Sequence, residues 1–212
     1  MQWTLVIPLK PLARAKSRLS GTAADALRPG LALAFALDTV AAALASPAVG
    51  DVAVVTGDAL AGRELAALGA DIIADEPGGG LNAALVHAVA VVRASRPDRA
   101  VAALNADLPA LRPAELNRVL NSAAEFPRAF LADAAGIGTT LLAARPPHAL
   151  LPEFGADSRA RHRTSGAHEL GLAGVDSVRQ DVDTGEDLRV ALSLGVGPRT
   201  AAATARLLIP GQ

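Results

Sequence analysis

Residues 100–109, AVAALNADLP, form a short apolar run that ends near the carboxylate of Asp107. A brief apolar run bounded by turn residues predicts a buried strand. Ligands of an open α/β sheet collect at the carboxyl ends of its strands, so an acid there indicates a binding edge. A second acidic stretch, DVDTGEDL, occupies residues 181–188. We predict that Asp107 and Asp183 meet around one Mg²⁺, because carboxylate oxygens are the hard ligands this cation prefers.

Away from this stretch, short β-like apolar runs alternate with longer helical ones. The expected elements up to residue 124 are strands Trp3–Leu9, Val52–Val55, Ile72–Ile73 and Ala100–Leu104, and helices Leu31–Leu44, Ala59–Leu68, Asn82–Arg93 and Pro113–Ala124. This order predicts an α/β fold, a single Rossmann-like domain over residues 1–212, with a mostly parallel sheet and helices on both faces.

The alternation of short strands and longer helices changes after Phe126. Two short strands, Ala129–Ala132 and Thr139–Ala143, predict a small antiparallel insertion. The remaining expected elements are a helix over Arg159–Leu170, a strand over Val178–Val182, a helix from Thr184 through Leu194 and a final helix over Arg199–Leu208. Thr184 followed three residues later by Asp187 is typical of a capping box.

Composition excludes several function classes. The 212 residues hold no Cys and no Tyr, so disulfides, thiolate metal sites and Cys or Tyr catalysis are absent. A net charge of −1 argues against general binding to nucleic acid or membranes. Charged residues, 19% of the chain, interrupt every apolar run before the roughly 18 residues a membrane helix needs. The first residues lack the layout of a secretory signal, and we expect a cytoplasmic protein.

A basic segment follows the first strand. Lys10, Arg14, Lys16 and Arg18 all precede Asp25, the first acid of the chain. Fixed cations at the carboxyl end of a strand suit a triphosphate and its leaving pyrophosphate. The Gly-Lys-Ser/Thr ending of a Walker A loop is missing. The alternative is an ordinary solvated basic loop.

A glycine turn, residues 78–80, precedes an expected helix. Without Cβ atoms, a base or ribose can approach the backbone closely, so Gly79 and Gly80 are predicted nucleotide contacts. Asn82 is either a further contact or a helix cap. Asp58, at the end of the second strand, is either another wall of the nucleotide pocket or a cap in an ordinary turn.

The later polar segments have similar alternatives. Asp107 could initiate the turn before Pro109, and Asp183 could merely precede a capped helix. The segment after Gly155 carries Ser158 and four basic side chains, Arg159, Arg161, His162 and Arg163. It predicts a small-anion site at a helix N-terminus, opposite Gly138-Thr139-Thr140, or else a solvated basic face.

Together these segments resemble one family, the small GT-A-like nucleotidyltransferases that act as 2-phospho-L-lactate and phosphoenolpyruvate guanylyltransferases in coenzyme F420 biosynthesis. The runs that carry the resemblance are Ile7-Pro8-Leu9-Lys10, Ala15-Lys16-Ser17-Arg18-Leu19, Gly79-Gly80-Leu81-Asn82, Ala106-Asp107-Leu108-Pro109, Gly138-Thr139-Thr140-Leu141, Phe154-Gly155, Ser158-Arg159-Ala160-Arg161-His162 and Asp181-Val182-Asp183-Thr184. Gly185 stands where Pro is commoner in the family, which loosens the helix start without removing Asp183.

The resemblance implies that an acceptor phosphate attacks the α-phosphorus of GTP and releases pyrophosphate. It also implies that Thr140, Gly155 and Ser158 contact phosphoenolpyruvate or 2-phospho-L-lactate. We assign catalytic roles to Lys10, Lys16 and Asp107, and metal binding to Asp107 and Asp183. The predicted nucleotide contacts are Pro8, Leu9, Arg14, Arg18, Asp58, Gly79, Gly80 and Asn82. A phosphomonoester is already ionised near neutral pH, so this attack requires no catalytic base.

Two alternatives remain at this level. The chain could transfer a nucleotide to another acceptor, such as a molybdopterin or a sugar phosphate, or it could be a nucleotide-binding module without catalysis. The sequence is compatible with either phosphoenolpyruvate or phospholactate and with a monomer or a homodimer.

Overall fold

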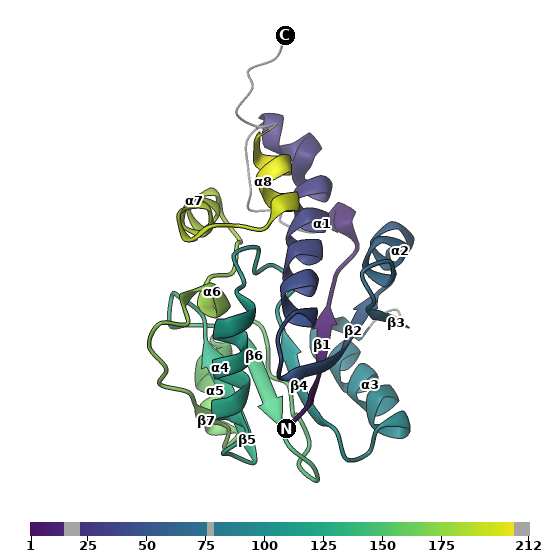
Figure 1. The fold of residues 1–212 in the computed structure, drawn as a ribbon, viewed down its shortest axis with the longest axis vertical. Coiled ribbons are helices and arrows are strands. Elements are labelled where there is room, and N and C mark those ends of the chain that lie inside the picture. Colours follow the sequence, from purple (N-terminus) through teal and green to yellow (C-terminus); the bar gives the residue numbers. More distant parts are fainter. Residues whose placement is uncertain (15–21, 76–78, 206–212) are drawn as a thin grey trace.

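The protein is built on one seven-stranded sheet in the order β3-β2-β1-β4-β6-β5-β7 (Figure 1). The computed structural model describes residues 1–14, 22–75 and 79–205. The strands are β1 (Trp3–Pro8), β2 (Val49–Thr56), β3 (Asp71–Ala74), β4 (Ala100–Leu104), β5 (Arg128–Ala132), β6 (Thr139–Ala144) and β7 (His168–Glu169). The predicted α/β class is confirmed.

The sheet is mostly parallel, as predicted. β1 pairs in parallel with β2 and β4, β2 pairs in parallel with β3, and β5 pairs in parallel with β7. β6 runs antiparallel to both β4 and β5. The carboxyl ends of β1, β4 and β5 therefore lie at the same edge as the start of β6, and that edge can collect polar residues from four chain segments.

Helices cover both faces of the sheet (Figure 1). They are the 3₁₀ helix η1 (Leu12–Arg14), α1 (Thr22–Leu44), α2 (Ala59–Ala66), α3 (Gly80–Ser95), α4 (Pro113–Ala123), α5 (Ser158–Thr164), α6 (Asp176–Arg179), α7 (Gly185–Leu194) and α8 (Pro198–Ala205). Alternate strand residues point to opposite faces, so Leu5 and Ile7 pack with α1, α2 and α4, whereas Val6 packs with α3.

A separate small core is formed by side chains of α1, α7, α8 and the loop after β4, and α8 lies alongside α1 in Figure 1. Phe35 of α1 is fully buried there, together with Val182 and Ala191. Asp38 of α1 accepts hydrogen bonds from the backbone N–H groups of Arg199 (3.2 Å) and Thr200 (2.7 Å). These contacts fasten the start of α8 onto α1.

Two predicted elements are wrong. The expected strand Val178–Val182 is instead the short helix α6 followed by an irregular segment. Val178 and Val182 are both buried, and a spacing of four residues suits one side of a helix as well as it suits a strand. The expected helix Arg159–Leu170 ends at Thr164, because Gly166 takes a left-handed φ of +83° and the chain continues into β7.

Several boundaries also differ from expectation. Helix α1 begins at Thr22 rather than near Leu31 and continues through Pro29. The final helix α8 spans Pro198–Ala205, and the last predicted residues of that helix, 206–208, lie outside the described part of the chain. Within the described residues, the helices are too short or too polar to cross a membrane.

Candidate active site

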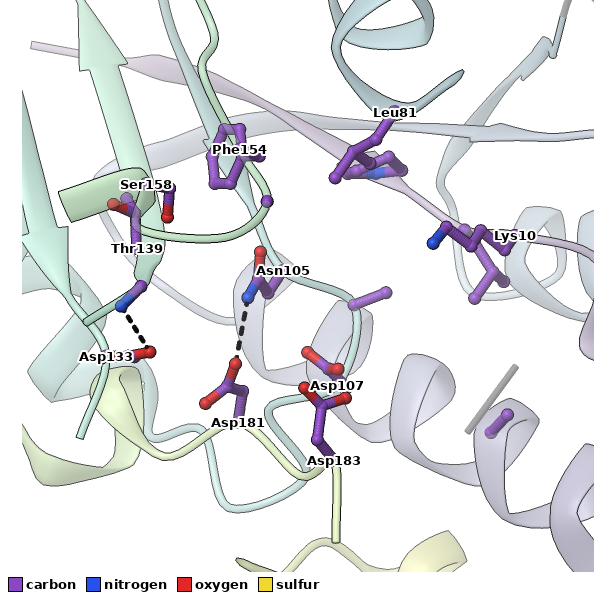
Figure 2. A pocket seen from close by; sticks show the side chains of 16 residues that line it. Lys10, Leu81, Asn105, Asp107, Asp133, Thr139, Phe154, Ser158, Asp181 and Asp183 are labelled. Carbon is purple, nitrogen blue, oxygen red and sulfur yellow. Dashed lines mark hydrogen bonds between the residues drawn. The ribbon is translucent and has the colours of Figure 1, made fainter. Parts of the chain in front are cut away.

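A cavity of about 540 Å³ opens at the carboxyl edge of the parallel strands (Figure 2). This volume is typical of sites for small molecules. Its walls come from the ends of β1 and β4, the β5–β6 turn, the segment before α5 and the segment before α7. The lining residues are Pro8, Leu9, Lys10, Ala32, Leu81, Asn105, Ala106, Asp107, Asp133, Gly138, Thr139, Phe154, Gly155, Ser158, Asp181 and Asp183.

The two acids predicted to meet do lie together. The carboxylates of Asp107 and Asp183 point toward one another in Figure 2. A backbone hydrogen bond from Val182 N–H to the Asp107 carbonyl, 3.0 Å long, joins the two segments. From the α1 side, the buried Thr39 Oγ1 accepts the Leu108 N–H at 3.1 Å. Asp107 follows β4 as predicted, whereas Asp183 follows an irregular segment and not a strand.

The capping box is confirmed and it shapes the second acidic segment. Thr184 Oγ1 accepts the Asp187 N–H, and Asp187 Oδ2 accepts the Thr184 N–H at 2.7 Å. The same Asp187 oxygen accepts the Asp183 N–H at 3.2 Å. Asp187 is thus a structural residue that orients the backbone of Asp183.

The donor set of the acid pair fits a hard divalent cation. Nowhere in the described residues do three or more His, Cys, Asp or Glu side chains form a complete metal cage. Mg²⁺ is commonly held by one or two carboxylates, with water and substrate phosphates as its other ligands. Two facing carboxylates in a wide cavity match that mode better than a closed protein site.

Lys10 brings positive charge to the cavity. It follows β1, is exposed, and lies across the cavity from Ser158 (Figure 2). Among the described lining residues it has the only cationic side chain, beside four carboxylates. Of the other predicted cations, Arg14 ends η1, and Lys16 and Arg18 lie outside the described residues.

Asp58 does not line the cavity. It caps α2 by accepting the N–H groups of Leu60 and Ala61, and its second oxygen accepts the Leu12 N–H at 3.0 Å. These hydrogen bonds to the anion, led by that from Leu12, lower the pKa of the Asp58 carboxyl below its usual range. Asp58 therefore anchors the segment after Lys10, and its predicted nucleotide contact stays a prediction.

The opposite wall contains two of the three predicted acceptor contacts, Gly155 and Ser158. Ser158 begins α5 and is 2% exposed. The third, Thr140, is fully buried and does not line the cavity, although the neighbouring Thr139 does. Its predicted contact with the acceptor stays a prediction.

His162 supports this wall from behind. It is fully buried; its Nε2 accepts the Glu153 N–H at 2.9 Å, and its Nδ1 lies 2.9 Å from Thr139 Oγ1. Because Nε2 accepts, the neutral ring carries its hydrogen on Nδ1 and donates it to Thr139. Burial, reinforced by Arg128 and Arg161, lowers the pKa of His162 to about 4.

The basic side chains of residues 159–163 do not line the cavity. Arg159 and Arg163 both pair with Glu169 of β7. Arg161 donates to the carbonyls of Glu153 and Phe154 at 3.2 Å each. These three arginines lie outside the cavity wall and make structural contacts. Their partners can be identified only in the folded structure.

Of the glycine turn, Gly78 lies outside the described residues, and Gly79 and Gly80 do not line the cavity. Gly79 and Gly80 are exposed at the start of α3, and Leu81 is the lining residue. Asn82 does not line the cavity and instead contacts the backbone of Phe154.

Sequence reasoning missed Asn105 and Asp133 and selected Asp183 rather than Asp181 as a metal ligand. Asn105 Nδ2 lies 3.4 Å from Asp181 Oδ2, which brings both side chains to the cavity. Asp133 accepts the N–H groups of Ile137 (2.9 Å) and Gly138 (2.8 Å), so it closes the β5–β6 turn. Asn105 and Asp133 directly follow buried strands, and that signal could have identified them.

Known proteins share both the sequence and the fold. Residues 3–203 match the family model described as guanylyl transferase CofC like. The chain is 81% identical to the phosphoenolpyruvate guanylyltransferase of Streptomyces avermitilis, covering 100% of this chain and 98% of the relative. Identity to the enzyme of the same name from Thermomonospora curvata is 59%, over 98% and 90% of the two chains.

Solved structures with much lower identity share the architecture. CMP:2-keto-3-deoxy-manno-octonic acid synthetase, complexed with CTP, aligns with a TM-score of 0.59 at 18% identity, over 97% of this chain and 100% of its own. For 4-diphosphocytidyl-2C-methyl-D-erythritol synthase the TM-score is 0.62 at 12% identity, with coverages of 91% and 98%. The fold is thus that of GT-A-like nucleotidyltransferases. With residues 3–203 matched by the family model and nearly the whole chain matched by these relatives, the chain belongs to the CofC-like guanylyl transferases.

Proposed function

We propose that this protein is a phosphoenolpyruvate guanylyltransferase that transfers GMP from GTP to the phosphate of phosphoenolpyruvate in coenzyme F420 biosynthesis. The observation that carries the proposal is the single cavity in which Lys10, the Asp107–Asp183 pair and the Gly155–Ser158 wall face one space. The names of full-length relatives at 74–81% identity support phosphoenolpyruvate as the acceptor.

The reaction joins two anions. An oxygen of the acceptor phosphate forms a bond to the α-phosphorus of GTP, the bond from that phosphorus to the bridging oxygen breaks, and pyrophosphate leaves. The acceptor oxygen is already deprotonated near neutral pH, so the residues must position charge rather than remove a proton. His162, which contacts the lining residue Thr139, uses both ring nitrogens in structural hydrogen bonds and stays neutral near pH 7, which supports a mechanism without a general base.

Each wall has a distinct part in this proposal. Asp107 and Asp183 hold Mg²⁺, which would offset phosphate charge when bound. Lys10, with Lys16 and Arg18 from the segment after it, binds the triphosphate and the departing pyrophosphate. Gly155 and Ser158 hold the acceptor, and the start of α3 lies on the nucleotide side.

Pyrophosphate release measures the proposed activity directly. The purified chain is incubated with Mg²⁺, one nucleotide (GTP or CTP) and one acceptor (phosphoenolpyruvate, 2-phospho-L-lactate or a sugar phosphate). We expect release with GTP and phosphoenolpyruvate, and slower release with phospholactate. Release only with a different acceptor would refute the assignment of phosphoenolpyruvate, and binding of GTP without release under any condition would indicate a non-catalytic module.

A further inference from the structure

The backbone of residues 153–154, just before Gly155, is held almost entirely by side chains. The amide of Asn82 makes two hydrogen bonds with Phe154: Oδ1 accepts its N–H at 2.9 Å, and Nδ2 donates to its carbonyl at 3.1 Å. These partners settle the orientation of the amide, since Phe154 N–H requires an oxygen and its carbonyl requires a donor. Both hydrogen-bonding atoms of Asn82 are therefore engaged by a residue 72 positions away.

Two residues of α5 hold the same segment from the other side. His162 accepts the Glu153 N–H, and Arg161 donates to the Glu153 and Phe154 carbonyls. The carbonyl of Phe154 thus receives one hydrogen bond from α3 and one from α5. The two N–H and two C=O groups of residues 153–154 belong to no helix or strand. These side chains are therefore the hydrogen-bond partners that they have.

The position of Gly155 depends on this arrangement. Gly155 has a left-handed φ of +115°, and its carbonyl accepts the Ser158 N–H at 3.2 Å. Glycine adopts such a φ without strain but is also free to leave it, so the flanking residues must fix the position of Gly155. Displacement of Phe154 would move Gly155 and, through it, the start of α5 at Ser158.

We infer that Asn82 is a positioning residue for the acceptor subsite: by fixing the Phe154 backbone it sets where Gly155 and Ser158 meet the acceptor phosphate. The sequence pattern predicts either a nucleotide contact or a helix cap for the same residue. The inference rests on the proposed function, because it takes Gly155 and Ser158 as acceptor contacts.

Steady-state kinetics with separate titration of the two substrates test the inference. For Asn82→Ala we expect the KM for phosphoenolpyruvate to rise about tenfold or more, as expected for two lost hydrogen bonds, and the KM for GTP to change by less than about twofold. Asn121→Ala is the matched control, because Asn121 is exposed on α4 and does not line the cavity. It should leave both KM values unchanged.

Arg161 is the site of a second test variant. Because Arg161 is exposed, its replacement should not disrupt the hydrophobic core. Arg161→Gln removes the other donor to the Phe154 carbonyl. Each residue partly substitutes for the other, so Asn82→Ala combined with Arg161→Gln should raise the KM for phosphoenolpyruvate by more than the product of the two single effects.

Three results would overturn the inference. A rise in the KM for GTP alone would make Asn82 a nucleotide contact. A lower thermal midpoint with both KM values unchanged would show that Asn82 only stabilises the first turn of α3. Hydrogen exchange at the Phe154 amide, which can be measured without enzyme activity, should be faster in Asn82→Ala. Unchanged exchange would show that Asn82 does not fix the Phe154 backbone.

If the wild type releases no pyrophosphate with phosphoenolpyruvate while exchange still increases, the proposed function fails and the acceptor role of Asn82 fails with it.

Discussion

At the scale of single residues, the acids of the cavity differ mainly in the partners that hold them. Asp133 closes a turn with two backbone N–H groups, and Asp181 lies beside the amide of Asn105. Asp107 and Asp183 face each other, with their backbones held by Val182 and Asp187. Geometry therefore favours this last pair for a shared cation, although all four side chains have the same chemistry.

Removal of either charge in the pair should abolish turnover while sparing the fold. We expect Asp107→Asn and Asp183→Asn to lower kcat by about 100-fold or more, because a neutral amide holds Mg²⁺ poorly. Both variants should remain folded, because the change from Asp to Asn keeps the size and shape of the side chain. Pyrophosphate release and thermal unfolding measure the two effects.

Asp98 offers the matched control, because it is exposed in the loop before β4, at the opposite edge of the sheet. Asp98→Asn should keep wild-type turnover. Wild-type kcat in either cavity variant would remove that acid from the metal site.

His162 should make stability depend on pH without affecting catalysis near neutrality. Its folded pKa of about 4 lies below the ordinary 6.5, so between these values the unfolded chain binds a proton that the folded chain excludes. The stabilisation is complete above pH 6.5 and is lost as pH falls toward 4. The free energy of unfolding should fall by about 3 kcal/mol across this window.

Urea unfolding at pH 7 and pH 4.5 measures that loss. His162→Gln, which has no titrating group, should lose less stability between the two pH values than the wild type. His148→Gln, at an exposed position, should behave as the wild type does. Equal pH dependence in wild type and His162→Gln would contradict the assignment.

At the scale of elements, the segment just before α8 supports the turn that follows Asp107. Gly197, before α8, donates its N–H to the Pro109 carbonyl at 2.9 Å. A Cβ built at Gly197 would come within 2.4–2.7 Å of three Asp38 atoms, and Asp38 is itself fixed by the start of α8. The absence of a side chain at Gly197 therefore lets α8, α1 and the β4 loop approach one another.

Gly197→Ala should disturb this junction. We expect a loss of about 1–3 kcal/mol in the free energy of unfolding from overpacking, together with lower kcat as the Asp107 turn shifts. Gly171→Ala is the matched control, because no atom lies within 4 Å of its Cβ position. Equal stability of the two variants would show that α8 can adjust without cost.

At the scale of the whole molecule, the fold concentrates negative charge where a negative substrate must bind. Four carboxylates line the cavity, and the described part of its wall has one cationic side chain, that of Lys10. A triphosphate therefore needs a counter-charge from a metal ion and from the basic segment after β1. Binding of metal and nucleotide should be strongly linked.

This linkage is measurable through thermal stability. GTP with Mg²⁺ should raise the thermal midpoint, by the equivalent of about 2.7 kcal/mol at a ligand concentration 100 times Kd. GTP with EDTA should give a much smaller shift, and excess Mg²⁺ should restore it. Asp107→Asn should lose the Mg²⁺-dependent part, and an equal shift with EDTA would argue against a metal-dependent nucleotide site.

Local patterns in the sequence are sufficient for much of the architecture. Apolar runs such as Ala100–Leu104 identify the parallel strands, since burial on both faces requires continuous apolar residues. Asp107 directly after a strand indicates the binding edge, and Thr184 with Asp187 identifies a helix start from spacing alone. These features depend on neighbours a few residues away, which is why a linear reading finds them.

Tertiary structure alone decided which polar side chains face the cavity. Asn82 has its partner 72 residues away, Asp58 has one of its partners 46 residues away, and Arg161 turns from a possible anion ligand into a support for a loop. Residue type and spacing were equally compatible with a ligand role or a structural role at each position. The physical reason is that a hydrogen-bonding side chain takes its role from the partner that folding brings to it, and that partner is not encoded in its own neighbourhood.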